Sequence, residues 1–288
     1  MCRNHIHLRS VLGLLQRNKR AIYVPLFMLT FSILGTVSFS DVESTIKLND
    51  IEIQIFPYTK EGTITAGEPL IAKVDIINKS EKEQKLVLGN NVHPYTYMEV
   101  LDQNGKTVAS TPKPENIVDG ISMLYALKPG ESFTRHLVVS ALYKFKSPGM
   151  YTIRIQQMEP NEGLSVMAEG TATVNVLPHS SSRLEARCNE ISRAMRGLDK
   201  TKEKLPISAY TKALYSVDDE AGLPSLEWMV REWDNKHACL VMRRIGTQRA
   251  NDVLSSLATR EDGPGKAARS AMKWSLEATD IMWEINYY

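Results

Sequence analysis

The sequence predicts a multidomain protein in which an all-β domain is followed by an all-α domain. Apolar and polar residues alternate along short segments between residues 45 and 177, which is the period of a half-buried strand. After residue 183 the apolar residues recur at helical spacing. The length of 288 residues suffices for two domains with separate cores. The predicted organisation is a leader at 1–40, a β domain at 41–178 and an α domain at 179–288.

The composition excludes several classes of protein. Hydrophobic residues make up 43% and charged residues 24% of the chain, which rules out a wholly disordered protein, a collagen and a multi-span membrane protein. Three cysteines are too few for a disulfide-built scaffold. The formal net charge of +2 argues against a dedicated nucleic-acid binder.

The first forty residues predict export. They contain no acid and five cations, followed by an uncharged run of 19 residues from Ala21 to Phe39; the cations are Arg3, Arg9, Arg17, Lys19 and Arg20. A cationic stretch before an apolar run is typical of a secretory signal. Ser38 and Ser40 occupy the −3 and −1 positions of a cut after Ser40.

Two alternatives for this leader stay open. A run of 19 residues nearly spans the hydrocarbon core of about 30 Å, so an uncleaved anchor is the second interpretation, with membrane contact only through residues 21–39. A buried core helix is the third. Under the first two interpretations the rest of the chain is periplasmic or extracellular. Removing the five leader cations from 35 leaves 30 Lys and Arg against 33 Asp and Glu, so the exported part is slightly acidic.

The β domain is predicted from alternation and turn signals. Ile51, Ile53 and Ile55 alternate with polar residues, and a Gly-Glu-Pro turn at 67–69 leads into the next strand at 70–77. A third strand, 95–101, is closed by a turn whose Asn104-Gly105 pair tolerates positive φ. Later strands are predicted at 132–139, 150–156 and 170–177.

These segments also resemble a known fold. GEPLIAKVDIINKS, LKPGESFTRHL, SPGMYTIRI and GTATVNVL are similar to the bacterial immunoglobulin-like β-sandwich modules of exported proteins, and to the β domain of bacterial intracellular proteinase inhibitors. The resemblance implies an antiparallel immunoglobulin-like sandwich, although residues 41–178 lack the immunoglobulin Cys and Trp residues. It also implies an alternative function, proteinase inhibition through the proline-stiffened loop from Ser110 to Asp119.

The α domain is predicted from apolar stripes. Leu184, Cys188, Ile191 and Met195 follow helical spacing after a polar segment at 178–182 that can cap the first helix. Further helices are predicted at 206–217, 222–233, 236–245, 248–260 and 266–280.

An internal similarity links two of these helices. Residues 213–219 align with residues 241–247 at an offset of 28, and a third partial copy begins near residue 271. The pattern resembles short HEAT-like repeats, which implies a small helical array in which each helix pair buries one face on its neighbours. An irregular helical bundle is the alternative.

No motif in the sequence predicts chemistry. HExxH, GxSxG, GxxxxGK[ST] and GxGxxG are all absent, so the sequence predicts no catalytic residue, no cofactor and no metal site. The acidic run Asp218-Asp219-Glu220 lacks calcium-loop spacing and is predicted to complement a helix dipole. Cys188 and Cys239 are compatible both with a disulfide and with two buried free thiols.

Aromatic and basic residues of the α domain predict an interaction surface. The candidates are Trp228, Trp233, Arg243, Arg244 and Trp283, since Trp and Arg are enriched at interfaces. Trp228 and Trp233 lie five residues apart, about 140° around a helix, so both cannot be centred on one face. Ordinary core packing is the competing interpretation.

The expected function is therefore a non-enzymatic binding protein of the cell envelope or extracellular space. Its expected partner is another protein or an envelope component, and not nucleic acid. Besides proteinase inhibition, a second alternative is a carbohydrate-binding or hydrolase-accessory protein. That alternative needs aromatics gathered on one sandwich face, and the candidates are Tyr95, Tyr97, Tyr125, Tyr143 and Tyr151.

Overall fold

The computed structural model describes residues 44–46, 50–88, 96–110, 123–159, 165–199 and 204–273. These residues all belong to one compact unit, Val37–Tyr288. The predicted leader at 1–40, with the cut after Ser40, lies outside the described residues. Among the helices that are described, none is long and apolar enough to cross a membrane.

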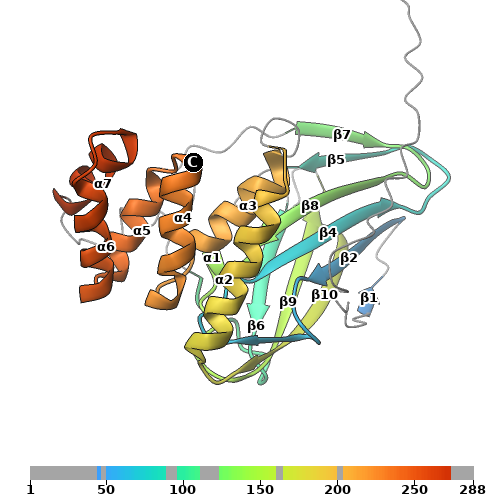
Figure 1. Cartoon of the computed structure of the whole chain (residues 1–288). Helices are drawn as coiled ribbons and strands as arrows, with labels where there is room; N and C mark the ends of the chain where they lie inside the picture. The colour runs from blue at the N-terminus through green and yellow to red at the C-terminus, as the bar shows by residue number, and fades with distance from the viewer. Residues whose placement is uncertain are drawn as a thin grey trace, which may run out of the picture. The chain divides into compact units, whose positions relative to one another are not determined.

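A mostly antiparallel β part comes first in the chain and a helical part follows it, as the sequence predicts (Figure 1). The largest sheet has the strand order β1–β10–β9–β6, and β3 pairs in parallel with β10. Its strands are β1 (Ser44–Ile46), β3 (Thr63–Thr65), β6 (Thr96–Leu101), β9 (Gly149–Met158) and β10 (Val166–Leu177). Both β9 and β10 are longer than predicted because they pair with each other from Gly149 to Met158.

The second sheet has the strand order β2–β4–β8, and a separate two-stranded sheet joins β5 to β7. These strands are β2 (Ile51–Pro57), β4 (Ile71–Asn78), β5 (Gln84–Leu88), β7 (Met123–Leu127) and β8 (Ser132–Val138). The turn predicted at 102–105 is present, with Gly105 at φ +74°, where a side chain would be strained.

The β core lies where β2 packs against β10 of the largest sheet. Ile51, Ile53 and Ile55 are each no more than 3% exposed, which confirms the face predicted from their alternation. They belong to the same buried cluster as Ile153 of β9. The approach is closest at Gly170 of β10, where a Cβ atom would lie 2.5 Å from the carbonyl oxygen of Ile53. A side chain at this position would push β10 away from β2.

The helical part begins at the predicted boundary, since β10 ends at Leu177 and α2 begins at Ser181. The Ser180 Oγ accepts a hydrogen bond from the Arg183 amide and so caps α2. The helices are α2 (Ser181–Arg196), α3 (Lys204–Tyr215), the 3₁₀ turn η1 (Glu220–Gly222), α4 (Leu223–Trp233), α5 (His237–Ile245), α6 (Gln248–Ala258) and α7 (Gly263–Lys273). A short helix, α1 (Val139–Leu142), follows β8.

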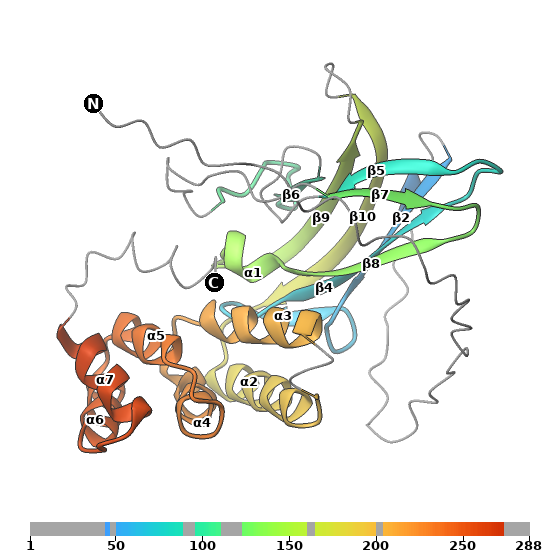
Figure 2. The ribbon, with the colours of Figure 1, turned by 90° about the horizontal axis from the view of Figure 1, so that it is seen from above.

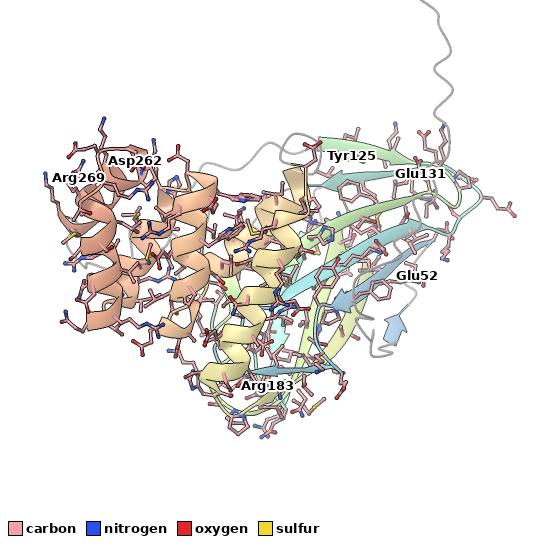
Figure 3. All side chains as sticks on the ribbon, in the orientation of Figure 1. Glu52, Tyr125, Glu131, Arg183, Asp262 and Arg269 are labelled. Atoms are coloured by element: carbon pink, nitrogen blue, oxygen red, sulfur yellow. The ribbon has the colours of Figure 1, made fainter. Side chains whose placement is uncertain are left out.

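The stripe predicted for α2 is confirmed, because Leu184, Cys188, Ile191 and Met195 are all buried in the helical core. In both views α2 and α3 lie next to the β2–β4–β8 sheet, whereas α6 and α7 lie farthest from it (Figures 1 and 2). Asp262 and Arg269 belong to this far end (Figure 3). There the Arg269 guanidinium donates a hydrogen bond to the Arg260 carbonyl at 2.8 Å, and Arg260 pairs with Asp262.

Candidate functional site

The seam between the β part and the helices has an apolar centre. Ile71 of β4, Val138 of β8 and Ala141 of α1 are buried in the same cluster as the core residues of α2 and α3. Burial of apolar surface stabilises the folded state by about 25 cal/mol per Å². The shared core therefore holds the β part and the helices in one fixed arrangement. At its edge the hydroxyl groups of Ser140 and Ser216 lie 2.8 Å apart and join α1 to the loop after α3.

Two basic side chains meet one carboxylate beside this apolar centre. The Lys144 ammonium, in the loop after α1, lies 2.9 Å from the Asp218 carboxylate and donates to the Ser216 carbonyl at 2.7 Å. The Arg244 guanidinium, near the end of α5, lies 2.9 Å from the other Asp218 oxygen. Arg244 also donates to the carbonyls of Tyr215 and Val217, the latter at 3.0 Å. It thereby satisfies backbone groups at the end of α3.

Burial shapes the electrostatics of these cations. It lowers the pKa of both Lys144 and Arg244, while Asp218 acts in the opposite direction. Arg244 and Lys146 add to the lowering of the Lys144 pKa through repulsion. The Asp218 side chain is 53% exposed, so the carboxylate also faces solvent.

A second polar group lies on the β side of the seam. The Glu68 carboxylate accepts a hydrogen bond from the Thr65 amide at 2.8 Å and lies 4.0 Å from the Arg187 guanidinium of α2. Arg187 also donates to the Tyr58 carbonyl at 2.8 Å, which ties α2 to the end of β2. Burial raises the pKa of Glu68, although the Thr65 amide and Arg187 act to lower it.

His179 joins the linker between the two parts to the loop after α3. Its Nε2 lies 3.0 Å from the Asp219 carboxylate. The same carboxylate accepts a hydrogen bond from the Ala221 amide at 2.8 Å and caps η1. The predicted role of the acidic run as a helix N-terminal group is therefore confirmed for Asp219, whereas Asp218 pairs with cations from α5 and from the loop after α1.

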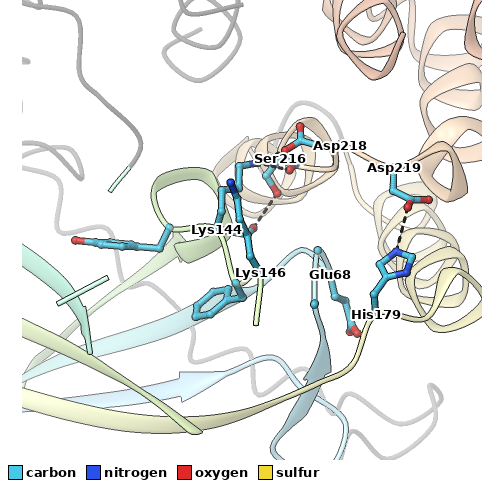
Figure 4. A pocket seen from close by; sticks show the side chains of 12 residues that line it. Glu68, Lys144, Lys146, His179, Ser216, Asp218 and Asp219 are labelled. Atoms are coloured by element: carbon cyan, nitrogen blue, oxygen red, sulfur yellow. Dashed lines mark hydrogen bonds and ion pairs between the residues drawn. The ribbon is translucent and has the colours of Figure 1, made fainter. Parts of the chain in front are cut away.

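These groups surround a cleft of about 300 Å³. Figure 4 shows Lys144 and Lys146 on one side of it and Glu68, His179 and Asp219 on the other. Ala66, Tyr143 and Phe145 contribute apolar surface. Within the part of the chain that the structure describes, no group of three or more His, Cys, Asp and Glu residues is placed to hold a metal ion. The cleft therefore places charged side chains next to apolar ones, which is the combination of groups found in ligand-binding pockets.

The predicted interaction surface is assembled only in part. Trp228 and Trp233 are both partly buried against the helical core, with ring centroids 5.7 Å apart, and the Arg196 guanidinium lies over the Trp228 ring at 4.7 Å. Arg244, predicted as a member of the interaction surface, is not exposed. Its side chain is 9% exposed because it turns inward to the carbonyls after α3.

The other members of that surface are separated from this stack. Arg243 donates to the Asn251 side chain of α6 at 3.3 Å. Trp283 lies outside the described residues. The apolar centre of the predicted surface is therefore Trp228 with Trp233, and its cation is Arg196, which was not among the predicted residues.

Of the two alternatives predicted for Cys188 and Cys239, the structure has the second, because both are free thiols buried in the helical core. Burial raises the pKa of each thiol to about 12. An apolar surrounding disfavours the thiolate, which is the form that attacks in disulfide exchange.

The aromatic face proposed for sugar binding is not formed by the described tyrosines. Tyr143 and Tyr151 are buried in the β core, and only Tyr97 is largely exposed, at 50%. Tyr125, labelled in Figure 3, packs on Phe133 with ring centroids 4.8 Å apart. Tyr95 lies outside the described residues, and so does the predicted inhibitory loop apart from Ser110, which bridges to Tyr143.

Sequence reasoning missed Lys144, Ser140 and Glu68 as members of one site. Glu68 was visible only as part of a turn, and Lys144 as an isolated cation between apolar residues. Their partners lie far away in the chain, because 72 residues separate Lys144 from Ser216. The acidic run at 218–220 was the one local signal.

Comparisons with known proteins give no family. No protein-family model matches the sequence, and no curated protein is significantly similar to it. Among solved structures, a CARDB domain from Pyrococcus furiosus, in complex with di-metal ions, is 16% identical; the match covers 45% of this chain and 94% of that domain, with a TM-score of 0.26.

Two larger proteins also match. A β-glucosidase from Listeria innocua is 19% identical over 45% of this chain, with a TM-score of 0.25. Alpha-2-macroglobulin from E. coli is 11% identical over 82% of this chain, with a TM-score of 0.26. The chain spans only 16% and 22% of the lengths of these two proteins. Similarity this low assigns neither a family nor an activity to the chain.

Proposed function

We propose that the protein is a non-enzymatic binding protein of the cell envelope or extracellular space, and that it recognises its partner at the seam. The observation that supports this is the contact between the β part and the helical part. Segments from the β part (66–68 and 144–146) and Ser216, Asp218 and Asp219 from the helical part line one cleft. They are held together by a shared core and by Asp218. A surface fixed in this way loses little conformational entropy on binding.

The proposal includes a finer description of the two parts. We infer an immunoglobulin-like sandwich, supported by the antiparallel sheets and the turn signatures of the sequence. We also infer a HEAT-like array, supported by the succession of helix pairs. α4 packs on α5 and α6 on α7, while α2 packs on α4 and α5 on α7 across the pairs.

Export belongs to the proposal as well, and it rests on the leader alone. A cationic stretch before a long uncharged run precedes a slightly acidic remainder. N-terminal sequencing of the protein from its native host distinguishes a cut after Ser40 from a retained anchor. A cytoplasmic location in fractionated cells would contradict export.

The binding function is tested by capture on the compact unit Val37–Tyr288. The unit is cross-linked to proteins of the host envelope, and the enriched species are compared for the wild type, His179→Arg and His237→Arg. His179→Arg fills the mouth of the cleft while keeping an ion pair with Asp219, whereas His237 is exposed on α5. We expect a partner that the wild type and the His237 variant enrich and the His179 variant does not. If no macromolecule is enriched over an uncoupled support, the proposal fails.

A further inference from the structure

The cleft at the seam has an uneven charge distribution. Two cations, Lys144 and Lys146, line one end of the cleft. The Asp218 carboxylate at this end contacts Lys144 and is shared with Arg244, which does not itself line the cleft. Lys146 is exposed and forms no ion pair within the described residues. This end of the cleft therefore holds more positive charge than its own carboxylate balances.

The acids at the other end are already engaged. Glu68 accepts a hydrogen bond from the Thr65 amide and faces Arg187. Asp219 accepts from the Ala221 amide and pairs with His179. Neither carboxylate contacts Lys144 or Lys146, so the excess positive charge remains available to a ligand.

The Lys144 ammonium also has donor capacity left over. An ammonium carries three N–H donors. The Ser216 carbonyl and the Asp218 carboxylate account for two of them. Because the Lys144 side chain is only 25% exposed and lines the cleft, a ligand oxygen in the cleft is the natural acceptor for the third.

Apolar side chains close the same space. Ala66, Tyr143 and Phe145 are each no more than 6% exposed, and they line the cleft together with the lysines. Charges attract more strongly next to apolar surface than in bulk water. A cleft of about 300 Å³ has room for an acid that also carries an apolar group.

We propose that the seam cleft binds a carboxylate carried next to an apolar group, with Lys144 and Lys146 as its cationic partners. The carboxylate accepts from the two ammonium groups, and the apolar group packs on Phe145 and Ala66. This inference names the ligand chemistry of the proposed function. It rests on that function in one respect only, namely that the seam is where the protein binds its partner. The carboxylate comes either from a small organic acid or chain terminus, or from an acidic side chain of a partner.

Two small probes test the chemistry directly. N-acetyl-leucine carries a carboxylate next to an apolar side chain, and N-acetyl-leucinamide differs from it only in lacking that carboxylate. Both are titrated into the Val37–Tyr288 unit while the amide NMR signals of Gly67, Phe145 and Asp219 are followed. We expect saturable shifts of these three signals with the acid and none with the amide. Equal binding of the two probes, or no shift with either, would overturn the proposal.

A charge reversal assigns the binding to the cleft. Because Lys146 is exposed, Lys146→Glu leaves the core intact, and we expect it to weaken N-acetyl-leucine binding about five- to tenfold. The matched control is Lys266→Glu on α7, also exposed, which should bind like the wild type. Unchanged affinity in Lys146→Glu would contradict the assignment.

A third probe distinguishes the two sources of the carboxylate. The blocked peptide acetyl-Ala-Ala-Glu-Leu-Ala-amide presents the acid as a side chain. Tighter binding of this peptide than of N-acetyl-leucine indicates a partner's acidic side chain, and the reverse order indicates a free acid or a chain terminus. These titrations need no cellular partner, so their outcome is independent of the capture experiment. The carboxylate site can be refuted while the binding function is supported, and the binding function can be refuted while the carboxylate site is supported.

Discussion

The Asp218 carboxylate lies 2.9 Å from the Lys144 ammonium, and this ion pair joins the loop after α3 to the loop after α1. The second carboxylate oxygen contacts Arg244 of α5 at the same distance. One half-exposed acid therefore neutralises two largely buried cations from opposite sides of the seam.

Removal of this acid should weaken the joint. We expect Asp218→Asn to lower the free energy of unfolding by about 1–3 kcal/mol, below the usual cost of breaking a buried ion pair because Asp218 is half exposed. Urea denaturation of the Val37–Tyr288 unit measures this. The control is Asp252→Asn on α6, where the exposed side chain accepts one hydrogen bond from Gln248, and the expected change is within about 0.5 kcal/mol. Equal effects in the two variants would contradict the role of Asp218.

Glu68 should make stability fall as the pH rises. Burial raises its pKa in the folded state, so the folded protein holds the proton more tightly than the unfolded chain does. This stabilisation is fully present below the unfolded pKa, near 4.5, and is lost as pH rises through the folded pKa.

We therefore expect Glu68→Gln to gain stability relative to the wild type between about pH 4 and pH 7. Paired denaturation curves across this range measure the difference. A constant difference would mean that burial and Glu190, which raise the Glu68 pKa, are cancelled by the Thr65 amide, Arg187 and Arg183, which lower it.

The thiols of Cys188 and Cys239 should be unreactive in the folded protein. Both are fully buried, and burial raises the pKa of each to about 12, so thiolate is scarce at neutral pH. Alkylation of the Val37–Tyr288 unit by iodoacetamide, followed by mass spectrometry, should label neither cysteine until denaturant unfolds the unit and then label both. Resistance to alkylation after unfolding without reductant would reveal a disulfide instead.

A side chain at position 170 should loosen the β core. Gly170→Ala places a Cβ atom 2.5 Å from the Ile53 carbonyl oxygen, and we expect a loss of about 1–3 kcal/mol from the overpacking. Thr173→Ala on the exposed face of the same strand is the control, with a change below about 0.5 kcal/mol. Thermal unfolding followed by circular dichroism compares them. A variant as stable as the wild type would show that β10 moves away from β2 at little cost.

Local periodicity accounts for the correct part of the fold prediction. The alternation of Ile51, Ile53 and Ile55 identifies a buried strand face, and the spacing from Leu184 to Met195 identifies a buried helix face. Each pattern depends on neighbours in the chain, because one face of a regular element repeats every two or about 3.6 residues. The change from strand to helix near Pro178 is visible for the same reason.

The site depends on contacts that no local pattern encodes. Arg244 was predicted as part of an interaction surface because Arg is enriched at interfaces, yet it turns inward to the carbonyls of Tyr215 and Val217. Lys144 gains its role from Ser216 and Asp218, more than seventy residues away.

The order of the two parts and the buried faces of β2 and α2 can be read from residue spacing, because the side chains of a regular backbone repeat on one face. In contrast, the free thiols of Cys188 and Cys239, the burial of Arg244, and the cleft shared by Lys144, Glu68 and Asp218 are visible only in the folded chain. Ion pairs and clefts form between segments that are distant in the chain, so no local pattern encodes them. Their geometry is set by how the shared core of Ile71, Val138 and the helices packs.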